Sequence, residues 1–190
     1  MGIRSSAGSL LFAIDAITGK PVVSFGTEGV ASLKAGLGPR AADLFVISTS
    51  PGVIYKDLYI IGTRVSENAD AAPGYIRAFN ARTGAVEWVF HTIPKPGEYG
   101  YETWPEDAYV KIGGANAWAG ISLDVERGVV YAPTGSASFD FWGGNRTGSN
   151  LFANCIIAID AETGQRLWNY QTVHHDLWDR DLPAPPNLVI

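Results

Sequence analysis

Short runs of hydrophobic residues, separated by turn-forming residues, dominate the pattern along this chain. Three of these runs lead into one recurring string, Ala-φ-Asp/Asn-Ala-x-Thr-Gly (φ an apolar residue), at residues 13–19, 78–84 and 158–164. The hydrophobic positions have the lengths and spacing of strands, and no convincing 3.6-residue period of helices is present. The pattern therefore predicts an all-β protein that repeats one structural unit.

Each repeat is predicted to form a β-hairpin. The hydrophobic run is the first strand, the Asp or Asn side chain caps the turn, and the glycine supplies a positive φ. A tryptophan follows the glycine by four residues in the second and third repeats, as Trp88 and Trp168, whereas the first repeat has Val23 there and Phe25 nearby. A tryptophan at this fixed position is expected to bury about 150–250 Å² against a neighbouring unit. We therefore assign Trp88 and Trp168 a structural role.

Two further strand pairs are predicted at residues 53–61 and 121–132. Four strands per unit favour β-propeller blades over a β-sandwich, the alternative, and the tryptophan-bearing repeat counts against the sandwich. We predict one partial β-propeller domain over residues 1–190, with about two complete blades and parts of their neighbours. Residues 186–190 are expected to begin another strand. This number of blades is too small to close a ring. Partner chains or the rest of a longer protein are therefore expected to complete it. Copies of the chain could also associate through their open blade edges.

Composition acts mainly by exclusion. The net charge is −5 and the Lys and Arg residues are scattered, whereas a nucleic-acid-binding protein is expected to show a basic stripe. No run reaches the roughly 18 apolar residues of a membrane span, and the N-terminal segment lacks the apolar region of a signal peptide. The single cysteine, Cys155, cannot form an internal disulfide and is expected to be a small buried hydrophobic residue.

Two loops carry more chemistry than blades require. In residues 114–120, Trp118 is flanked by small residues and could be a core residue or a flat platform for a planar ligand. Residues 173–183, rich in Asp, could form a solvated ion-paired rim, a metal site or a catalytic loop. Neighbours in an extended loop point in opposite directions, so at most one of His174 and His175 would bind a given metal. A carboxylate beside a tryptophan in an apolar setting can hold a raised pKa and act as a base.

Together these strings resemble the pyrroloquinoline quinone (PQQ) dehydrogenases. The resemblance rests on the tryptophan-bearing repeat, on Trp-Gly-Gly-Asn-Arg-Thr at residues 142–147, and on Val-His-His-Asp-Leu-Trp-Asp-x-Asp-Leu-Pro at residues 173–183. It extends over about residues 9–189 and is strongest to the membrane-bound glucose dehydrogenase branch. The repeat alone is weakly specific because non-enzymatic propellers share it, whereas the His-His-Asp-Leu-Trp-Asp string is far more specific.

The resemblance implies an eight-bladed quinoprotein propeller that holds PQQ and a divalent ion, usually calcium, on its axis. Carried over by motif, Asp179 matches the catalytic base and Trp118 matches the tryptophan that stacks on PQQ. Asn116 and Ser138 fall at positions that contact the cofactor. The metal ligands implied are Asp179 and Ser136, which stands where alcohol-oxidising members carry an asparagine.

The activity implied by the resemblance is oxidation of a sugar (aldose) or alcohol in the periplasm, with a quinone or cytochrome as electron acceptor. The glucose-type motif favours a sugar. The family's other cofactor contacts, including a basic residue downstream of the Asp motif, fall outside this chain, so the isolated chain is expected to be inactive. The alternative function is a non-catalytic propeller scaffold built from the same repeats.

Overall fold

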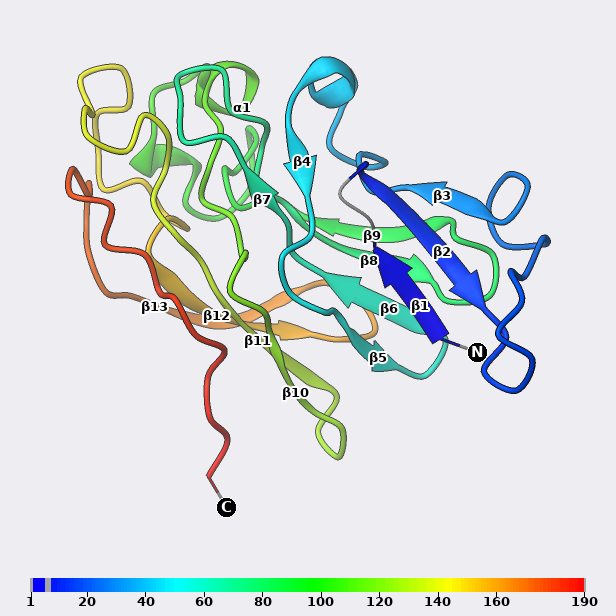
Figure 1. Ribbon diagram of the computed structural model, residues 1–190. Helices are drawn as coiled ribbons and strands as arrows, with labels where there is room; N and C mark the ends of the chain where they lie inside the picture. Colours follow the sequence, from blue (N-terminus) through cyan, green and yellow to red (C-terminus); the bar gives the residue numbers. More distant parts are fainter. Residues whose placement is uncertain (1, 6–7, 190) are drawn as a thin grey trace.

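The computed structural model describes residues 2–5 and 8–189, and its regular elements are mostly short β-strands arranged as neighbouring sheets (Figure 1). The predicted all-β class is confirmed. The helical elements are η1 (Pro39–Asp43), η2 (Tyr101–Thr103) and α1 (Ala108–Lys111). The strands are β1 (Gly2–Ser5), β2 (Leu10–Ile14), β3 (Val30–Ser32), β4 (Val46–Ile47), β5 (Val53–Tyr55), β6 (Leu58–Ile61), β7 (Arg64–Val65), β8 (Ile76–Asn80), β9 (Val86–Phe90), β10 (Ser122–Asp124), β11 (Val129–Pro133), β12 (Cys155–Asp160) and β13 (Arg166–Gln171).

Two four-stranded antiparallel sheets have the strand orders β5-β6-β8-β9 and β10-β11-β12-β13. The sheet β1-β2-β3 precedes them, and β4 and β7 form a separate short pair. The predicted strand pairs correspond to β5–β6 and β10–β11, and the second and third repeats form the hairpins β8–β9 and β12–β13. Each four-stranded sheet is thus a meander of the kind that makes a propeller blade.

The strand predicted to begin at residue 186 is wrong. Residues 186–189 are irregular, and Ile190 lies outside the described residues. The carbonyl of Pro186 accepts a hydrogen bond from the Ser122 hydroxyl rather than from a strand. Pro186 lacks the N–H group that a sheet ladder needs, and no strand of the described residues pairs with residues 187–189.

The side chains of β6 and of β8 alternate between two hydrophobic clusters, one on each face of their sheet. Tyr59 and Phe79 belong to the hydrophobic cluster shared with the β1-β2-β3 sheet, whereas Ile60 and Ala78 belong to the cluster shared with the β10-β11-β12-β13 sheet. This follows from the two-residue period of a strand, which sends neighbours to opposite faces. Cys155 lies fully buried in the second cluster, and burial raises the pKa of its thiol to about 12, as expected of a buried hydrophobic residue.

Trp88 joins one blade to the next. Its indole Nε1 donates a hydrogen bond of 3.2 Å to the Ala161 carbonyl, and a Cβ on Gly164 would lie 2.6 Å from the ring. Trp88 is 9% exposed, so its predicted structural role is confirmed. The burial expected of Trp168 is wrong: its side chain is 48% exposed. No sheet follows β13 in the described part of the chain, so no turn glycine covers this ring.

In the first repeat, Phe25 rather than Val23 takes the tryptophan's place. Phe25 is fully buried and packs against Gly84 of the next sheet, whereas Val23 is exposed. The Gly26 N–H also donates to the Thr83 carbonyl, at 2.8 Å. The junction between blades is therefore kept although the aromatic residue is shifted by two positions.

The turns of the three repeats have the predicted geometry. In each, the side-chain Oδ1 of Asp15, Asn80 or Asp160 accepts hydrogen bonds of 2.7–3.1 Å from the backbone N–H groups two and three residues later. The following glycines have φ angles of 70–74°. Side-chain capping and a left-handed glycine together close each hairpin within a few residues.

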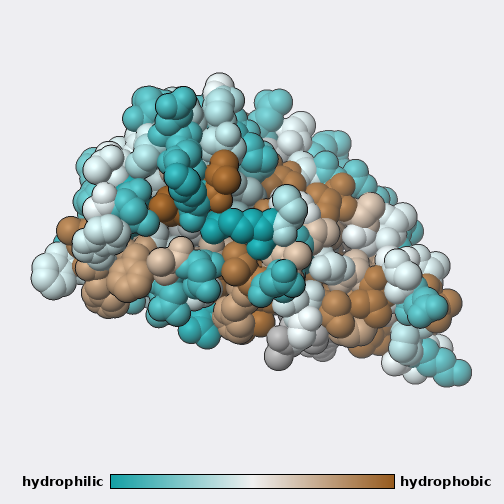
Figure 2. All heavy atoms as spheres, turned by 90° about the horizontal axis from the view of Figure 1, so that it is seen from above, coloured by the Kyte–Doolittle hydropathy of each residue, from teal (hydrophilic) through white to brown (hydrophobic). Residues whose placement is uncertain are grey.

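The strand ends opposite these turns carry the longer connections. Seen from the end that carries α1 and the loop 139–150, the surface is largely hydrophilic, with smaller hydrophobic patches between (Figure 2). Within the described residues, no helix is both long enough and apolar enough to cross a membrane.

Candidate functional site

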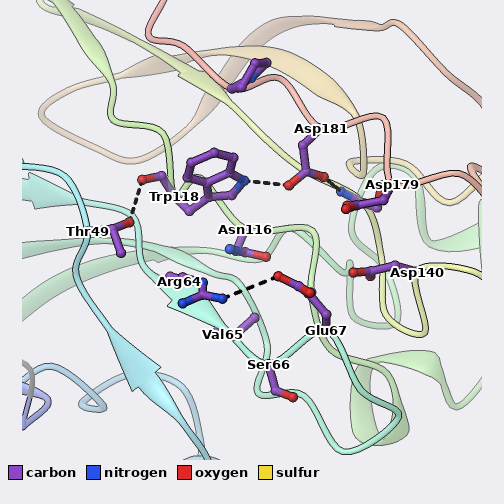
Figure 3. Close-up of a pocket in the computed structure, with 13 residues that line it drawn as sticks. Thr49, Arg64, Val65, Ser66, Glu67, Asn116, Trp118, Asp140, Asp179 and Asp181 are labelled. Atoms are coloured by element: carbon purple, nitrogen blue, oxygen red, sulfur yellow. Dashed lines mark hydrogen bonds and ion pairs between the residues drawn. The ribbon is translucent and has the colours of Figure 1, made fainter.

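A cleft of about 570 Å³ opens among the loops at this end of the blades (Figure 3). Four of the residues singled out in the sequence, Asn116, Trp118, Ser136 and Asp179, come together around it, although they lie on three separate segments. The full lining is Thr49, Arg64, Val65, Ser66, Glu67, Gly114, Asn116, Trp118, Ser136, Asp140, Asp179, Asp181 and Pro183.

Trp118 is held at both its backbone and its ring. Its carbonyl accepts hydrogen bonds from the hydroxyls of Thr49, at 3.0 Å, and Ser50, at 2.9 Å. Its indole Nε1 donates to Asp181 Oδ2 at 2.6 Å. The side chain is half-buried and lines the cleft. Of the two interpretations open for this residue, the structure favours a platform over a core tryptophan.

Asn116 is fixed beside Trp118. Its side-chain Nδ2 donates to the Thr63 carbonyl at 2.9 Å, and its own carbonyl accepts from the Gly135 N–H at 3.0 Å. This bond uses one of the two hydrogens on Nδ2, so the second N–H and the amide oxygen of Asn116 are left for a ligand.

Ser138 does not line the cleft. Its backbone N–H donates to the Gly113 carbonyl at 3.1 Å, and Gly114 and Ala137 form a β-bridge beside it. These contacts hold Ser138 against the backbone of residues 113–114, where its hydroxyl is buried without a hydrogen-bond partner. Ser138 thus lies behind the cleft lining in this chain, and its predicted contact with the cofactor stays a prediction.

Asp176 organises the loop that carries Asp179. Its carboxylate accepts hydrogen bonds from the Ser136 hydroxyl (2.7 Å) and from the backbone N–H groups of Trp178 (3.1 Å) and Arg180 (2.6 Å). Burial acts to raise the pKa of Asp176, but these hydrogen bonds outweigh it and hold the pKa below its ordinary value. Asp176 is thus a buried, ionised anchor of the turn at residues 176–180.

The two most specific motifs contact each other. Within the Trp-Gly-Gly-Asn-Arg-Thr segment, the buried Arg146 guanidinium donates to the carbonyls of Asp176, at 2.6 Å, and Phe139, at 3.1 Å. A Cβ on Gly143 would lie 2.5 Å from His175 Nε2. His175 is thus packed against the neighbouring loop, and Arg146, which the sequence did not single out, ties the two loops together.

Asp179 is turned toward the cleft in a left-handed conformation, with φ of 54°. Although its side chain is exposed, partial desolvation raises its pKa, and the nearby carboxylates of Asp181, Glu67 and Asp176 raise it further. Trp178 beside it is 70% exposed. The pKa of Asp179 is therefore raised, as the sequence suggested, by desolvation first and by the surrounding carboxylates second.

Asp140 is a second carboxyl of the cleft that the sequence did not reveal. It is 4% exposed and accepts no hydrogen bond from the described residues. Burial first, and then the charges of Asp179, Asp181 and Glu67, raise its pKa to about 7, against the opposing effect of Arg146. A buried carboxyl without a partner among other carboxyls is a site of excess negative charge.

The negative charge of these carboxylates attracts a cation to the cleft. Glu67, Asp140 and Asp179 offer the oxygen donors that calcium prefers, and a bound cation would relieve the repulsion among them. No three acidic, His or Cys side chains of the described residues already converge as a ready metal cluster. Ser136 is less suited to bind the ion, because its hydroxyl donates to Asp176 and accepts from Asn154 Nδ2 at 3.1 Å.

Comparisons with known proteins place this chain in a family. The family described as PQQ: glucose/ethanol/alcohol dehydrogenase, beta-propeller domain, matches residues 3–190. The quinate/shikimate dehydrogenase (quinone) of Acinetobacter baylyi is 38% identical over 183 residues, and the quinoprotein glucose dehydrogenase A of Acinetobacter calcoaceticus is 37% identical over 182. Both alignments cover 94% of this chain and 22% of the relative, so the chain spans about a fifth of these relatives' length.

A solved structure is also similar. The quinohemoprotein alcohol dehydrogenase from Comamonas testosteroni superposes with a TM-score of 0.79 and 26% identity, over 96% of this chain and 27% of that one. The partial propeller architecture is thereby confirmed. The chain therefore belongs to the family of PQQ-dependent glucose/ethanol/alcohol dehydrogenases, as the resemblance of its motifs indicated.

Proposed function

We propose that the cleft is part of the PQQ site of a dehydrogenase that oxidises a sugar (aldose) or an alcohol. The observation that carries this proposal is the meeting of Trp118 and Asp179, from separate loops, on one cleft. Relatives of nearly equal identity are named for quinate or shikimate and for glucose, so the substrate's identity is left to experiment.

PQQ, when bound, supplies an electrophilic quinone that accepts a hydride from the substrate. The indole of Trp118 offers the flat surface on which a planar cofactor stacks, and Asn116 lies beside it to donate or accept at the cofactor's edge. Asp179 accepts the proton of the substrate hydroxyl at its carboxylate. Asp179 reaches the cleft from a loop other than that of Trp118, and a base has to lie within hydrogen-bond reach of a substrate beside the platform.

The proposed cation is calcium, held by the carboxylates of Glu67, Asp140 and Asp179. Its positive charge would offset their mutual repulsion and so lower the pKa of Asp179 relative to the metal-free protein. Ser136 and Asp179 were the ligands implied by the motifs. The hydrogen bond from the Ser136 hydroxyl to Asp176 favours another role for Ser136, in which it holds the Asp176 carboxylate in place.

The remaining parts of the proposal rest on the family. We place the protein in the periplasm. Its proposed electron acceptor is a quinone or a cytochrome, and one relative is named as a dehydrogenase that uses a quinone. Blades outside this chain complete the pocket, so the 190-residue chain alone is expected to show little or no turnover. Association of copies through open blade edges is tested by a mass measurement in solution.

The test is reconstitution with PQQ and calcium, followed by dye-linked oxidation of glucose, quinate and ethanol by the full-length protein that carries this chain. Asp179→Asn should lower turnover by about 10²–10⁴-fold, the usual contribution of a general base, while PQQ affinity is kept. The matched control is Asp57→Asn, an exposed carboxylate at the opposite end of the blades, and it should leave turnover unchanged.

Three outcomes would each contradict a part of the proposal. A wild-type protein that binds no PQQ would support the scaffold alternative. Full turnover in Asp179→Asn would remove Asp179 as the base. Robust turnover by the 190-residue chain alone would contradict the proposal that further blades complete the pocket.

A further inference from the structure

Both carboxylate oxygens of Asp181 accept hydrogen bonds from neighbouring residues. Oδ2 accepts the hydrogen bond from Trp118 Nε1 at 2.6 Å, and Oδ1 accepts one from the Ser136 backbone N–H, also at 2.6 Å (Figure 3). Both bonds are short and charge-assisted, the kind that fixes geometry most firmly. Asp181 therefore connects two segments that are distant from it in the sequence.

The carboxylate of Asp181 also occupies the space that the missing side chain of Gly135 leaves, which is called its seat below. A Cβ on Gly135 would lie 2.4 Å from Oδ1 and 2.6 Å from Oδ2, so the carboxylate lies against the backbone of residue 135. Only glycine leaves this space. The Gly135 N–H in turn donates to the carbonyl of Asn116, which joins the seat to the segment that carries Trp118.

The two aspartates of this loop have different surroundings. Asp179 accepts no hydrogen bond from the described residues, and its carboxylate is open to the cleft. Asp181 has its charge shared between an indole N–H and a backbone N–H. A cation would compete with both of these donors at Asp181, but with none at Asp179.

Holding the indole N–H fixes more than one atom of Trp118. Thr49 and Ser50 hold the backbone carbonyl, and Asp181 holds the far edge of the ring, so rotation about either side-chain torsion would break the bond to Asp181. A planar ligand that stacks on the indole takes its orientation from the plane of that ring. Fixing the plane before the ligand arrives reduces the ordering cost of binding.

We propose that Asp181 is a positioning residue that fixes the plane of the Trp118 indole, and that it is not a ligand of the cation. This inference rests on the proposed function, because it assigns the platform to PQQ. The hydrogen bond itself can be tested without any cofactor.

The first experiment records the indole N–H signals of the ¹⁵N-labelled chain, which has six tryptophans. Trp118→Phe removes, and so assigns, the signal of Trp118. In Asp181→Asn that signal should show the largest upfield shift of the six, because a neutral amide replaces a charged acceptor. The other indole signals should keep their positions, which shows that the variant is folded.

Gly135→Ala is the independent variant, because it alters neither Asp181 nor Trp118. Its Cβ occupies the seat of the carboxylate, so the same upfield shift of the Trp118 signal is expected. Asp43→Asn, an exposed aspartate remote from the cleft lining, is the control and should shift none of the six signals. An unchanged Trp118 signal in both Asp181→Asn and Gly135→Ala would overturn the anchoring, whatever the protein's function.

The second experiment measures PQQ and calcium affinity in the full-length protein. Asp181→Asn should weaken PQQ binding about tenfold, the effect of losing one well-placed interaction, and should lower calcium affinity far less than Asp179→Asn does, because it removes a nearby charge and not a ligand. Combined with Trp118→Phe, it should add no further loss, because both changes remove the same bond. Additive losses, or a fall in calcium affinity as large as that of Asp179→Asn, would contradict the proposal. Absence of PQQ binding in the wild type would instead refute the proposed function.

Discussion

The two ends of the blades differ in how they satisfy their polar groups. At the turn end, Asp15, Asn80 and Asp160 each cap the backbone within three residues, and a glycine takes the left-handed position. At the cleft end, left-handed glycines such as Gly114 are joined by five left-handed residues that are not glycine, and several buried polar atoms have no partner in the described chain. The left-handed residues other than glycine are Ala115, Asn150, Asn154, His175 and Asp179. The buried polar atoms without a partner belong to Ser138, Arg146 and Asn154.

This difference separates stability from function. Left-handed residues other than glycine cost about 1–3 kcal/mol each and persist only where the surroundings impose them. The turns of the three repeats avoid that cost, whereas the cleft end accepts it at five positions and also gathers four carboxylates. Changes at the turn end should therefore act on the free energy of unfolding, and changes in the open part of the cleft should act on ligand binding.

The largest effect on stability is expected from Trp88→Ala. Loss of this buried ring and of its bond to Ala161 should lower the free energy of unfolding by about 3–5 kcal/mol. Trp168→Ala, at the same position of the next repeat, should lower it by less than about 1 kcal/mol because that ring is 48% exposed. Urea denaturation of the chain measures both values. Equal losses would show that burial against the next blade does not set the contribution of these tryptophans.

A smaller loss of unfolding free energy is expected from Asp176→Ala. This residue is an exception to the comparison, because it lies at the cleft end and yet acts on stability. Asp176 lies at the cleft end, yet it anchors a turn through three hydrogen bonds and is 3% exposed. Removing it leaves buried donors unpaired and should cost about 2–3 kcal/mol of unfolding free energy. Denaturation curves with Asp179→Asn as the matched variant test this. A loss as large in Asp179→Asn would mean that the two aspartates do not differ in role.

The smallest effect is expected at a repeat turn. Asp160→Ala should cost about 1 kcal/mol, since it removes the cap from one hairpin, whereas Asp160→Asn should cost little because Asn80 caps the second repeat in the same way. Hydrogen bonds from the Thr163 backbone and side chain lower the pKa of Asp160. Its contribution is therefore present above the ordinary pKa of 3.8 and is lost as the pH falls through the lower, folded-state pKa.

The measurement for this turn is the unfolding free energy of the wild type and of Asp160→Asn between pH 7 and pH 2. Their difference should change only below about pH 4. A difference that changes between pH 5 and pH 7 would show that Asp160 is not ionised and capped in the way described.

Much of the fold was predictable because the repeat encodes it locally. Capping residue, glycine and hydrophobic run lie within a few residues of each other, so residues 158–164 suffice to predict a hairpin. The position of Phe25 was not predictable in this way, because its partner Gly84 belongs to another sheet. The exposure of Trp168 likewise depends on what packs against it rather than on its own repeat.

The site was predictable only where a motif carried it. Asn116, Trp118 and Asp179 belong to recognisable strings, and the structure brings them to one cleft. Glu67 and Asp140 lie in irregular loops, and only tertiary contacts place their carboxylates there. The position of Ser138 likewise depends on a β-bridge between distant segments, and its contact with the cofactor stays a prediction.

The central claim is that the cleft end of these blades binds PQQ on Trp118, and titration of the full-length protein with PQQ tests it most directly. Trp118→Ala should weaken binding at least about tenfold, the effect of losing a stacking surface worth roughly 1.4 kcal/mol. Trp168→Ala, which removes a tryptophan outside the cleft, should leave the affinity unchanged. Equal affinities for the wild type and Trp118→Ala would contradict the account.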